Sequence, residues 1–311
     1  MIMRIKKYVT FIMPITMRKV GRKLHTKFCS TSLLQIDSLY GHVETSKLMH
    51  SHNRSTSGIM KHSCDGEAWQ QFDIDFPDYE LRNVRLAVAT DGFTPFSLTA
   101  TTYSCWPVFV TPLNLPPGVL LRPEYIFLAL VVPGPKHPGT KLNILMQPLV
   151  DELHQLGRGL NTWDALVKHN FPMRAIFLWS VHDFLAYGDF AGWSTHGRLA
   201  CPCGYGCIGF TLRHGRKACW FDCHRRFLPK NHPFRKQANA FRKNTRVLEE
   251  QPRRLTGEEM HAQVPNLVAD TNSFGKLHNW TFVSCFRTLP YFPKLMLPHN
   301  IDLMHNEKKF G

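Results

Sequence analysis

Residues 84–92 read VRLAVATDG, a short apolar run that ends in an acid and a glycine. Leu86 and Val88 alternate with alanines, which predicts a short buried strand. The strand is expected to stop at Asp91, because Asp-Gly is a common turn pair. This stretch therefore predicts one strand of a sheet with a carboxylate at its end.

Further apolar runs extend the same pattern on the C-terminal side. Residues 103–111 (YSCWPVFVT) and 125–132 (YIFLALVV) predict two strands, and Pro107 in the first favours an edge position or a bulge. Leucines at helical spacing predict an amphipathic helix from near Pro148 to Gly157. Residues 174–181 (RAIFLWSV) predict a fourth strand. The order strand, strand, strand, helix, strand indicates an α/β fold with a mixed sheet.

Acids follow the first and the fourth of these strands, as Asp91 and Asp183. Side chains at the carboxyl ends of neighbouring strands face one crevice, where two carboxylates can hold divalent ions for phosphoryl chemistry. The alternative is local: Asp91 caps a turn and Asp183 caps the following helix.

Composition limits the class of protein. The chain has 311 residues, 43% hydrophobic, which is enough for a sizeable core and corresponds to about two domains. Lys and Arg number 38 against 23 acids, for a net charge of +15, which predicts a polyanionic partner. No apolar run has the roughly 18 residues of a membrane helix, so we expect no membrane association.

Residues 198–254 carry most of this charge: fourteen basic residues stand against three acids, a net +11. Phenylalanines and a tryptophan are interleaved with the basic residues, a combination that suits backbone contact and base stacking on DNA. The alternative is a solvated basic loop. The predicted DNA-binding residues are Arg216, Lys217, Arg225, Arg226, Lys230, Arg235 and Lys236.

The same segment is rich in cysteine and histidine, which indicates zinc binding. The C-P-C spacing is not the usual C-x-x-C, and free cysteines in a loop are the alternative. The candidate Zn²⁺ ligands are Cys201, Cys203, Cys207, Cys219, Cys223 and His224.

Residues 1–36 contain no acid, and RKVGRK at 18–23 is a weak nuclear signal, although an acid-free basic start also fits an organelle presequence. We expect residues 1–62 to form a basic, poorly ordered tail and linker.

Long motifs of the chain match one known family. They include DGEAWQQFD (65–73), RNVRLAVATDGFTPF (82–96), FLWSVHDFLAYGDFAGWSTHGRLACP (177–202) and HGRKACWFDCHRRFLPKNHPFR (214–235), with HNWTFVSCFRTLPYFPKLMLPHNIDLMHNEK at 278–308. Over residues 65–310 the chain resembles the transposase of plant CACTA-type (En/Spm) DNA transposons. The resemblance implies a nuclear protein with transposon ends as its DNA partner, and self-association is an open expectation.

The resemblance also implies a ribonuclease-H-like core that cuts and rejoins DNA with two Mg²⁺ or Mn²⁺ ions held by three acids. DGFTPF gives Asp91 as the first metal ligand, and the motif after the fourth strand gives Asp183 as the second. The family's D-x-x-H motif falls on Asp302 and His305, so Asp302 is the other candidate for second ligand. The Cys pair falls on Cys201 and Cys203, with His224 close by.

Two departures from the family matter. The Cys motif is one residue short, with Cys207 as a substitute ligand. The third acid of the family's set is expected beyond Gly311, which predicts a catalytically incomplete protein and an incomplete sheet. The expected domains are residues 1–62 (tail), 63–197 (first part of the core), 198–254 (basic Cys/His insertion) and 255–311 (continuation). The remaining alternatives are a non-catalytic DNA-binding remnant and a structural protein without a nucleic-acid role.

Overall fold

The computed structural model describes residues 27–28, 32–50, 55, 59–94, 103–201, 209–212, 219–239, 244–253, 255–263 and 279–302. The chain forms two compact units. Unit 1 consists of residues 1–190 and 284–311, and unit 2 of residues 191–283. The chain thus leaves unit 1, forms unit 2, and returns to complete the first core.

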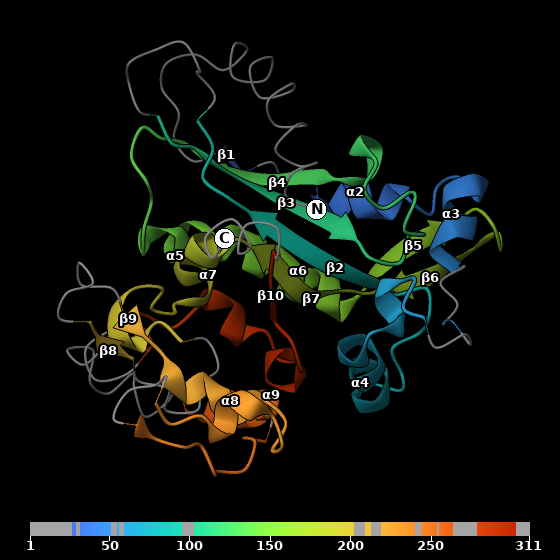
Figure 1. Ribbon diagram of the computed structural model, residues 1–311. Helices are drawn as coiled ribbons and strands as arrows, with labels where there is room; N and C mark the ends of the chain where they lie inside the picture. Colours follow the sequence, from blue (N-terminus) through green and yellow to red (C-terminus); the bar gives the residue numbers. More distant parts are fainter. Residues whose placement is uncertain are drawn as a thin grey trace. The chain divides into compact units, whose positions relative to one another are not determined.

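Unit 1 is a mixed α/β structure around one sheet (Figure 1). Its strands are β1 Lys27–Phe28, β2 Val84–Thr90, β3 Trp106–Pro112, β4 Phe127–Val132, β5 Leu160–Asp164, β6 His169–Met173, β7 Ala175–His182 and β10 His299–Ile301. Its helices are α2 Ser32–Ser38, α3 Val43–His50, α4 Glu67–Asp75, α5 Lys141–Leu145, α6 Gln147–Arg158 and α7 Phe184–Ala191. Single turns of 3₁₀ helix lie at Ser63–Asp65, Pro123–Tyr125, Cys285–Thr288 and Phe292–Lys294.

The main sheet has the order β1-β4-β3-β2-β7-β10, and β5 and β6 form a separate hairpin. Strands β2, β3 and β4 pair antiparallel, whereas β7 pairs parallel with both β2 and β10. The four predicted strands are confirmed as β2, β3, β4 and β7. Pro107 lies next to a register shift at Val108/Phe109, so the predicted bulge is confirmed and the edge position is wrong.

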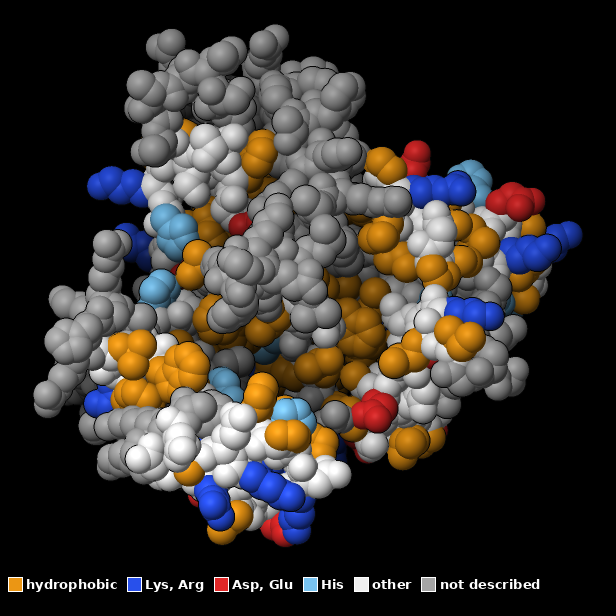
Figure 2. Space-filling view, viewed as in Figure 1, with side chains coloured by type: hydrophobic (Ala, Val, Ile, Leu, Met, Phe, Trp, Pro, Cys, Tyr) orange, Lys and Arg blue, Asp and Glu red, His pale blue; other side chains and the backbone are white. Residues whose placement is uncertain are grey.

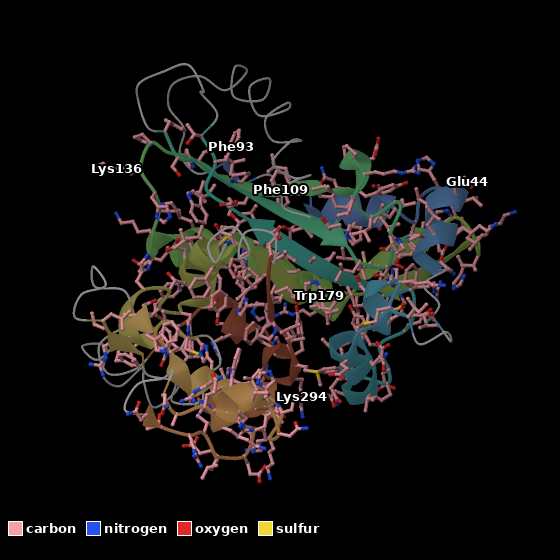
Figure 3. The ribbon with its side chains drawn as sticks, in the orientation of Figure 1. Glu44, Phe93, Phe109, Lys136, Trp179 and Lys294 are labelled. Atoms are coloured by element: carbon pink, nitrogen blue, oxygen red, sulfur yellow. The ribbon has the colours of Figure 1, made fainter. Side chains whose placement is uncertain are left out.

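Every residue of β2 and β3 is buried, because both faces of these strands are covered. Side chains of successive residues point to opposite faces of a strand. Val88 and Val108 accordingly belong to the main core, whereas Ala89 and Phe109 belong to a small second cluster with Phe93 at its border. Figure 3 labels Phe93 and Phe109 of this second cluster.

Helix α6 covers one face of the sheet, in contact with β7. It buries Leu149, Leu153 and Leu156, one stripe at helical spacing, as the sequence predicts. The helix runs one residue further than expected, to Arg158, and Gly159 caps it with a φ of 102° that is accessible to glycine at little cost. Packing of this stripe holds the crossover between β4 and β7 against the sheet.

Arg85, the second residue of β2, is fully buried. Its Nη2 donates to Asp73 Oδ1 at 2.8 Å, and its Nη1 donates to the Asn83 carbonyl oxygen at 2.8 Å. The guanidinium also lies 4.7 Å from the ring centre of Tyr79 and 5.1 Å from that of Trp69. A buried charge is tolerated when it is paired and hydrogen-bonded, so Arg85 ties α4 and the turn after it to β2.

Residues 32–50 differ from the predicted tail. They form α2, α3 and the turn between them, and bury Ile36, Tyr40 and Met49 in the main core. The prediction of a poorly ordered segment over 1–62 is therefore wrong for this part. The prediction extended the basic, acid-free composition of residues 1–36 to the whole of residues 1–62, and composition carries no information on long-range packing.

Helix α3 is held to the β5–β6 hairpin by Asp164, which is fully buried. The carboxylate accepts hydrogen bonds from Ser46 Oγ at 2.6 Å, His50 Nε2 at 2.8 Å and Arg82 Nη1 at 3.1 Å. Burial raises the pKa of Asp164, but these hydrogen bonds outweigh it and hold the pKa at about 2. Three segments far apart in the chain therefore meet at one carboxylate.

Unit 2 contains β8 Phe210–Thr211, β9 Cys219–Trp220, α8 Pro233–Lys236 and α9 Gly257–Ala262, with 3₁₀ turns at Gly197–Leu199 and Asp222–Phe227. Its two ends meet where Trp193 pairs with Trp280. Gly192, with φ 77°, permits this approach, because a Cβ there would lie 2.3 Å from the Phe282 carbonyl oxygen. Among the described residues of both units, no helix has the length and apolar character to cross a membrane.

We expect Asp164→Asn to lower the free energy of unfolding by about 2 to 4 kcal/mol at pH 7, because it removes one partner of a buried ionic network. The folded pKa of Asp164 is lowered, so the wild type has the full contribution above about pH 4 and loses it as the pH falls toward 2. Urea unfolding at pH 7 and pH 3 measures both effects. The exposed Asp78→Asn is the control, and an equal loss in the two variants would contradict the assignment.

Candidate functional site

Three acids lie at the carboxyl ends of the three parallel strands. Ala89 of β2 pairs with Val181 of β7, and each stands two residues before an acid, Asp91 and Asp183 respectively. In β10, Asp302 follows Ile301, which pairs with the residue before Asp183. The acids therefore stand at the same level of adjacent strands, which lie about 4.8 Å apart.

Asp91 does not sit in a tight turn. The chain continues in extended form to Phe93, whose backbone N–H donates to the Cys105 carbonyl oxygen at 2.8 Å. Between them, Gly92 lies against Trp106, and a Cβ there would be 3.2 Å from the indole ring. Asp91 therefore stands where β2 passes from regular pairing into an isolated bridge, and the turn-cap alternative does not describe it.

Asp183 does cap a helix, as its local alternative predicts. Its Oδ1 accepts a hydrogen bond from the backbone N–H of Ala186 at 2.7 Å, at the start of α7. This bond uses one carboxylate oxygen and fixes the side chain. Capping and metal binding are compatible for a carboxylate, because it has two oxygens and about four lone-pair directions.

Asp302 is held in the same ladder. Its backbone N–H donates to the His182 carbonyl oxygen at 2.7 Å, which extends the pairing of β10 with β7 by one residue. The sequence left Asp183 and Asp302 as competing second ligands, and the structure places both at the edge that Asp91 occupies. His305, the other member of the D-x-x-H motif, lies outside the described residues.

The chemistry of this edge suits a hard cation, because carboxylate oxygens are the ligands that Mg²⁺ and Mn²⁺ prefer. Within the described part of the chain, no three His, Cys, Asp or Glu side chains stand close enough to hold a metal ion. The three acids therefore share an edge without forming a closed ligand cage.

Two histidines behind this edge were not among the predicted site residues. His182 is fully buried, and burial lowers its pKa to about 4. The pKa of His299 is well below its usual value through burial and the neighbouring His182 and Arg287. His299 Nδ1 lies 2.7 Å from Ser180 Oγ, and both rings contact Phe190. These imidazoles are neutral at pH 7 and act as packing groups. The H-D pair after an apolar run marks the place of His182, and no such pair marks His299.

In unit 2, the structure brings two of the predicted zinc ligands together. Cys201 Sγ, which is buried, lies 3.1 Å from His224 Nε2. Cys219 belongs to β9 and is half-buried. Cys203 and Cys207 lie outside the described residues, and so does the side chain of Cys223.

Two of the predicted DNA-binding arginines are buried in unit 2. Arg225 Nη1 donates to the carbonyl oxygens of Gln237 at 3.0 Å and Thr245 at 3.2 Å. Arg235 donates to the carbonyl oxygens of Leu228 at 2.9 Å and Val247 at 3.2 Å. These guanidinium groups hold loops of unit 2 together, which gives both residues a structural role.

Other basic residues of unit 2 reach the surface. Lys230 and Lys236 are exposed, and Arg226 is half-buried over the ring of Phe227. Figure 2 shows Lys and Arg side chains beside acidic ones on the part of unit 2 that carries α8 and α9, and Lys230 pairs with Glu250. Arg216 and Lys217 lie outside the described residues.

Comparison with known proteins identifies a family for the chain. A family model described as "Transposase family tnp2" matches residues 57–267, which include Asp91, Asp183 and most of unit 2. No curated protein and no solved structure matches the chain.

We expect Arg225→Met to destabilise unit 2 by about 2 to 4 kcal/mol, because it removes a buried guanidinium whose hydrogen bonds join the loops around Gln237 and Thr245. Lys236→Met removes the same charge from an exposed position and should change stability by less than about 0.5 kcal/mol. Hydrogen exchange, read by mass spectrometry on peptides from residues 219–250, measures the effect locally. Equal protection in the two variants would contradict a structural role for Arg225.

Proposed function

The chain belongs to the tnp2 family of transposases, and from that premise we propose that it acts on DNA strands at the edge formed by Asp91, Asp183 and Asp302. The proposed reaction is metal-dependent strand cleavage and transfer of the CACTA type, in the nucleus. The mixed sheet then corresponds to the ribonuclease-H-like core that the resemblance implies. Acids at the carboxyl ends of parallel β2, β7 and β10 support this proposal.

The level placement of the three acids is the observation that carries the proposal. A divalent cation at this edge would offset the negative charge of the three carboxylates. Bound there, Mg²⁺ or Mn²⁺ would supply charge neutralisation for a phosphodiester and activation of the attacking water. The oxygen-only donor set fits these ions and does not fit zinc.

The chain's own residues would do three things at this edge. The cap to Ala186 holds Asp183 in one orientation, so the carboxylate is pre-organised. The ladder bond from Asp302 to β7 keeps the third acid level with the second. His182 is fully buried and His299 half-buried, and both imidazoles are neutral, so they add no positive charge that would compete with the cation.

A zinc site in unit 2 is a second part of the proposal. Neighbouring sulfur and nitrogen ligands of tetrahedral zinc lie about 3.6 Å apart. Cys201 and His224, at 3.1 Å, are close enough to supply two of four ligands. Cys203, Cys207, Cys219 and Cys223 are the candidates for the others, and such a site would connect two segments of unit 2.

A non-catalytic DNA-binding role of unit 2 is the second candidate function. It is favoured by exposed basic and aromatic side chains within one short stretch: Lys230 and Lys236, with Trp220 and Phe234 about half exposed. Basic groups neutralise phosphates and aromatic rings stack on unpaired bases. This role needs no metal at the acid edge.

We expect the purified chain to bind Mn²⁺ and, if its three acids suffice for the reaction, to nick DNA. Asp91→Asn should then lower the rate at least about a hundredfold, because a ligand of the reaction's cation is lost. Asp78→Asn, an exposed acid away from the edge, is the matched control. Electron paramagnetic resonance measures Mn²⁺ binding separately from strand cleavage. Binding without nicking would mean that the acids on this chain do not suffice, the incompleteness that the resemblance predicts. Neither binding nor nicking would overturn the metal site.

We expect DNA affinity to fall steeply with salt, and the double variant Lys230→Gln/Lys236→Gln to flatten the logarithmic salt slope by about 2, because each phosphate contact contributes about 0.9. Lys136→Gln/Lys141→Gln removes the same charge from exposed positions of unit 1. Filter binding from 50 to 200 mM salt measures the slopes. Equal slopes for the two double variants would place the contact surface elsewhere.

A further inference from the structure

Unit 1 has a pocket of about 350 Å³ at the end of β7 opposite the acid edge. Ile176 of β7 lines it, seven residues before Asp183, which in a strand corresponds to about 23 Å. Its volume falls within the usual range of small-molecule pockets, about 300 to 1,000 Å³. The pocket is thus large enough for a ligand and separate from the acids.

One wall of the pocket is a rigid set of aromatic rings. Phe76 stacks on Phe72 with ring centres 4.6 Å apart, and Tyr79 meets Phe72 edge-on at 5.3 Å. The Tyr79 hydroxyl donates to the Val84 carbonyl oxygen at 3.1 Å, which fixes the ring. Phe76 and Tyr79 are half-buried, so parts of both rings remain accessible. Because the rings are already fixed, the wall offers a flat apolar surface to a ligand without an ordering step on binding.

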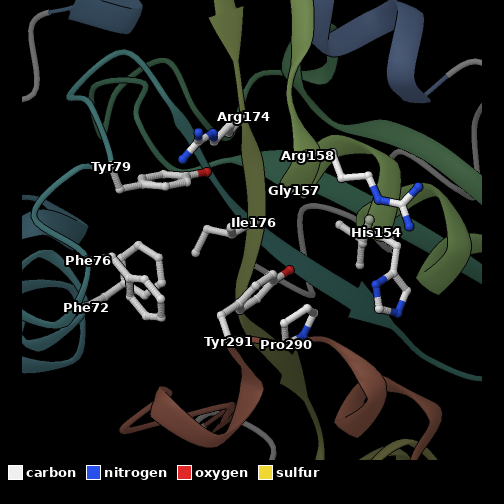
Figure 4. A pocket seen from close by; sticks show the side chains of 11 residues that line it. Phe72, Phe76, Tyr79, His154, Gly157, Arg158, Arg174, Ile176, Pro290 and Tyr291 are labelled. Carbon is white, nitrogen blue, oxygen red and sulfur yellow. The ribbon is translucent and has the colours of Figure 1, made fainter.

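Cationic groups line the pocket on two sides. Figure 4 shows Arg174 on the side of Tyr79, and Arg158 with His154 on the opposite side. Both arginines are exposed, and neither forms an ion pair with an acid in the described part of the chain. A guanidinium binds phosphate oxygens in a planar, two-bonded geometry. The pocket therefore combines an aromatic wall with charge available for anions.

We propose that this pocket binds one unpaired nucleotide of a DNA strand. The base lies against Phe76 and Tyr79, and the adjoining phosphates are bound by Arg158 and Arg174. Aromatic rings accept any base face, so the site has little sequence preference. An acidic peptide would use the arginines but has no flat ring to match the aromatic wall. The site requires no metal and is independent of the proposed chemistry at Asp91.

The test uses the full chain in EDTA and a fluorescent ten-nucleotide thymidine oligomer, with anisotropy as the readout. Arg158→Gln and Arg174→Gln should each weaken binding about five- to tenfold, the effect of losing a charge-assisted hydrogen bond. Arg122→Gln removes the same charge from another exposed site of unit 1 and should change affinity less than about twofold. Equal losses in all three variants would overturn the proposal.

The base contact needs its own measurement. Phe76→Leu keeps the apolar volume but removes the ring, and it should weaken binding at least about fivefold. An abasic oligomer should show the same loss with the unaltered chain. Equal affinity for the abasic oligomer, or for a duplex of the same length, would show that no unpaired base is bound and would overturn the proposal.

Two further experiments identify the source of the nucleotide and separate binding at this pocket from chemistry at the acid edge. If thymidine monophosphate displaces the oligomer and shows the same dependence on Arg158 and Arg174, the site accepts free nucleotides with the proposed chemistry. If it does not displace the oligomer, the nucleotide comes from a DNA strand. Asp91→Asn should bind the oligomer like the unaltered chain, so failure of the acid edge leaves this result unaffected. Displacement by a poly-glutamate peptide and not by abasic or natural DNA would assign the pocket to acidic peptides and overturn the proposal.

Discussion

Parallel pairing of β2 with β7 is the constraint on which the rest of unit 1 depends. Parallel neighbours require a long crossover, and here the chain supplies β3, β4, α6 and the β5–β6 hairpin before it returns. The crossover helix packs its leucine stripe on β7, and the pair becomes the buried centre of the sheet. The same pairing sets Asp91 level with Asp183, so the candidate site follows from the sheet topology.

Buried charges organise the other end of the sheet. Arg85 and Asp164 are both fully buried: Arg85 joins α4 and the turn after it to β2, and Asp164 has partners from segments distant in the chain. Such groups are retained only where nearly all their hydrogen bonds are made, so they favour one arrangement of the backbone over its alternatives. Tyr79 connects the Arg85 site with the pocket, because its ring faces Arg85 and also lines the pocket. A wall of the pocket is thus packed against a buried arginine that does not itself line the pocket.

Unit 2 shows that positive charge and DNA contact are separate properties. Its buried arginines, Arg225 and Arg235, donate to carbonyl groups of loops that have little regular secondary structure. In helices and strands, backbone carbonyl groups accept hydrogen bonds from backbone N–H groups. In these loops, the arginine side chains donate to the carbonyl groups instead and so order the segment. The exposed lysines of the same segment carry the charge that a polyanion can meet. Net charge therefore overstates the number of contacts available to DNA.

The sequence by itself determined the four main strands, the crossover helix and the acids after β2 and β7, because alternation and helical spacing are local properties of the chain. The β5–β6 hairpin was missed, since Asn, His and Pro interrupt its apolar pattern. Only the tertiary structure decided that residues 32–50 belong to the core, that Asp302 joins the edge of Asp91 and Asp183, and which arginines are buried. Each of these facts depends on pairing between distant segments, which no local pattern encodes.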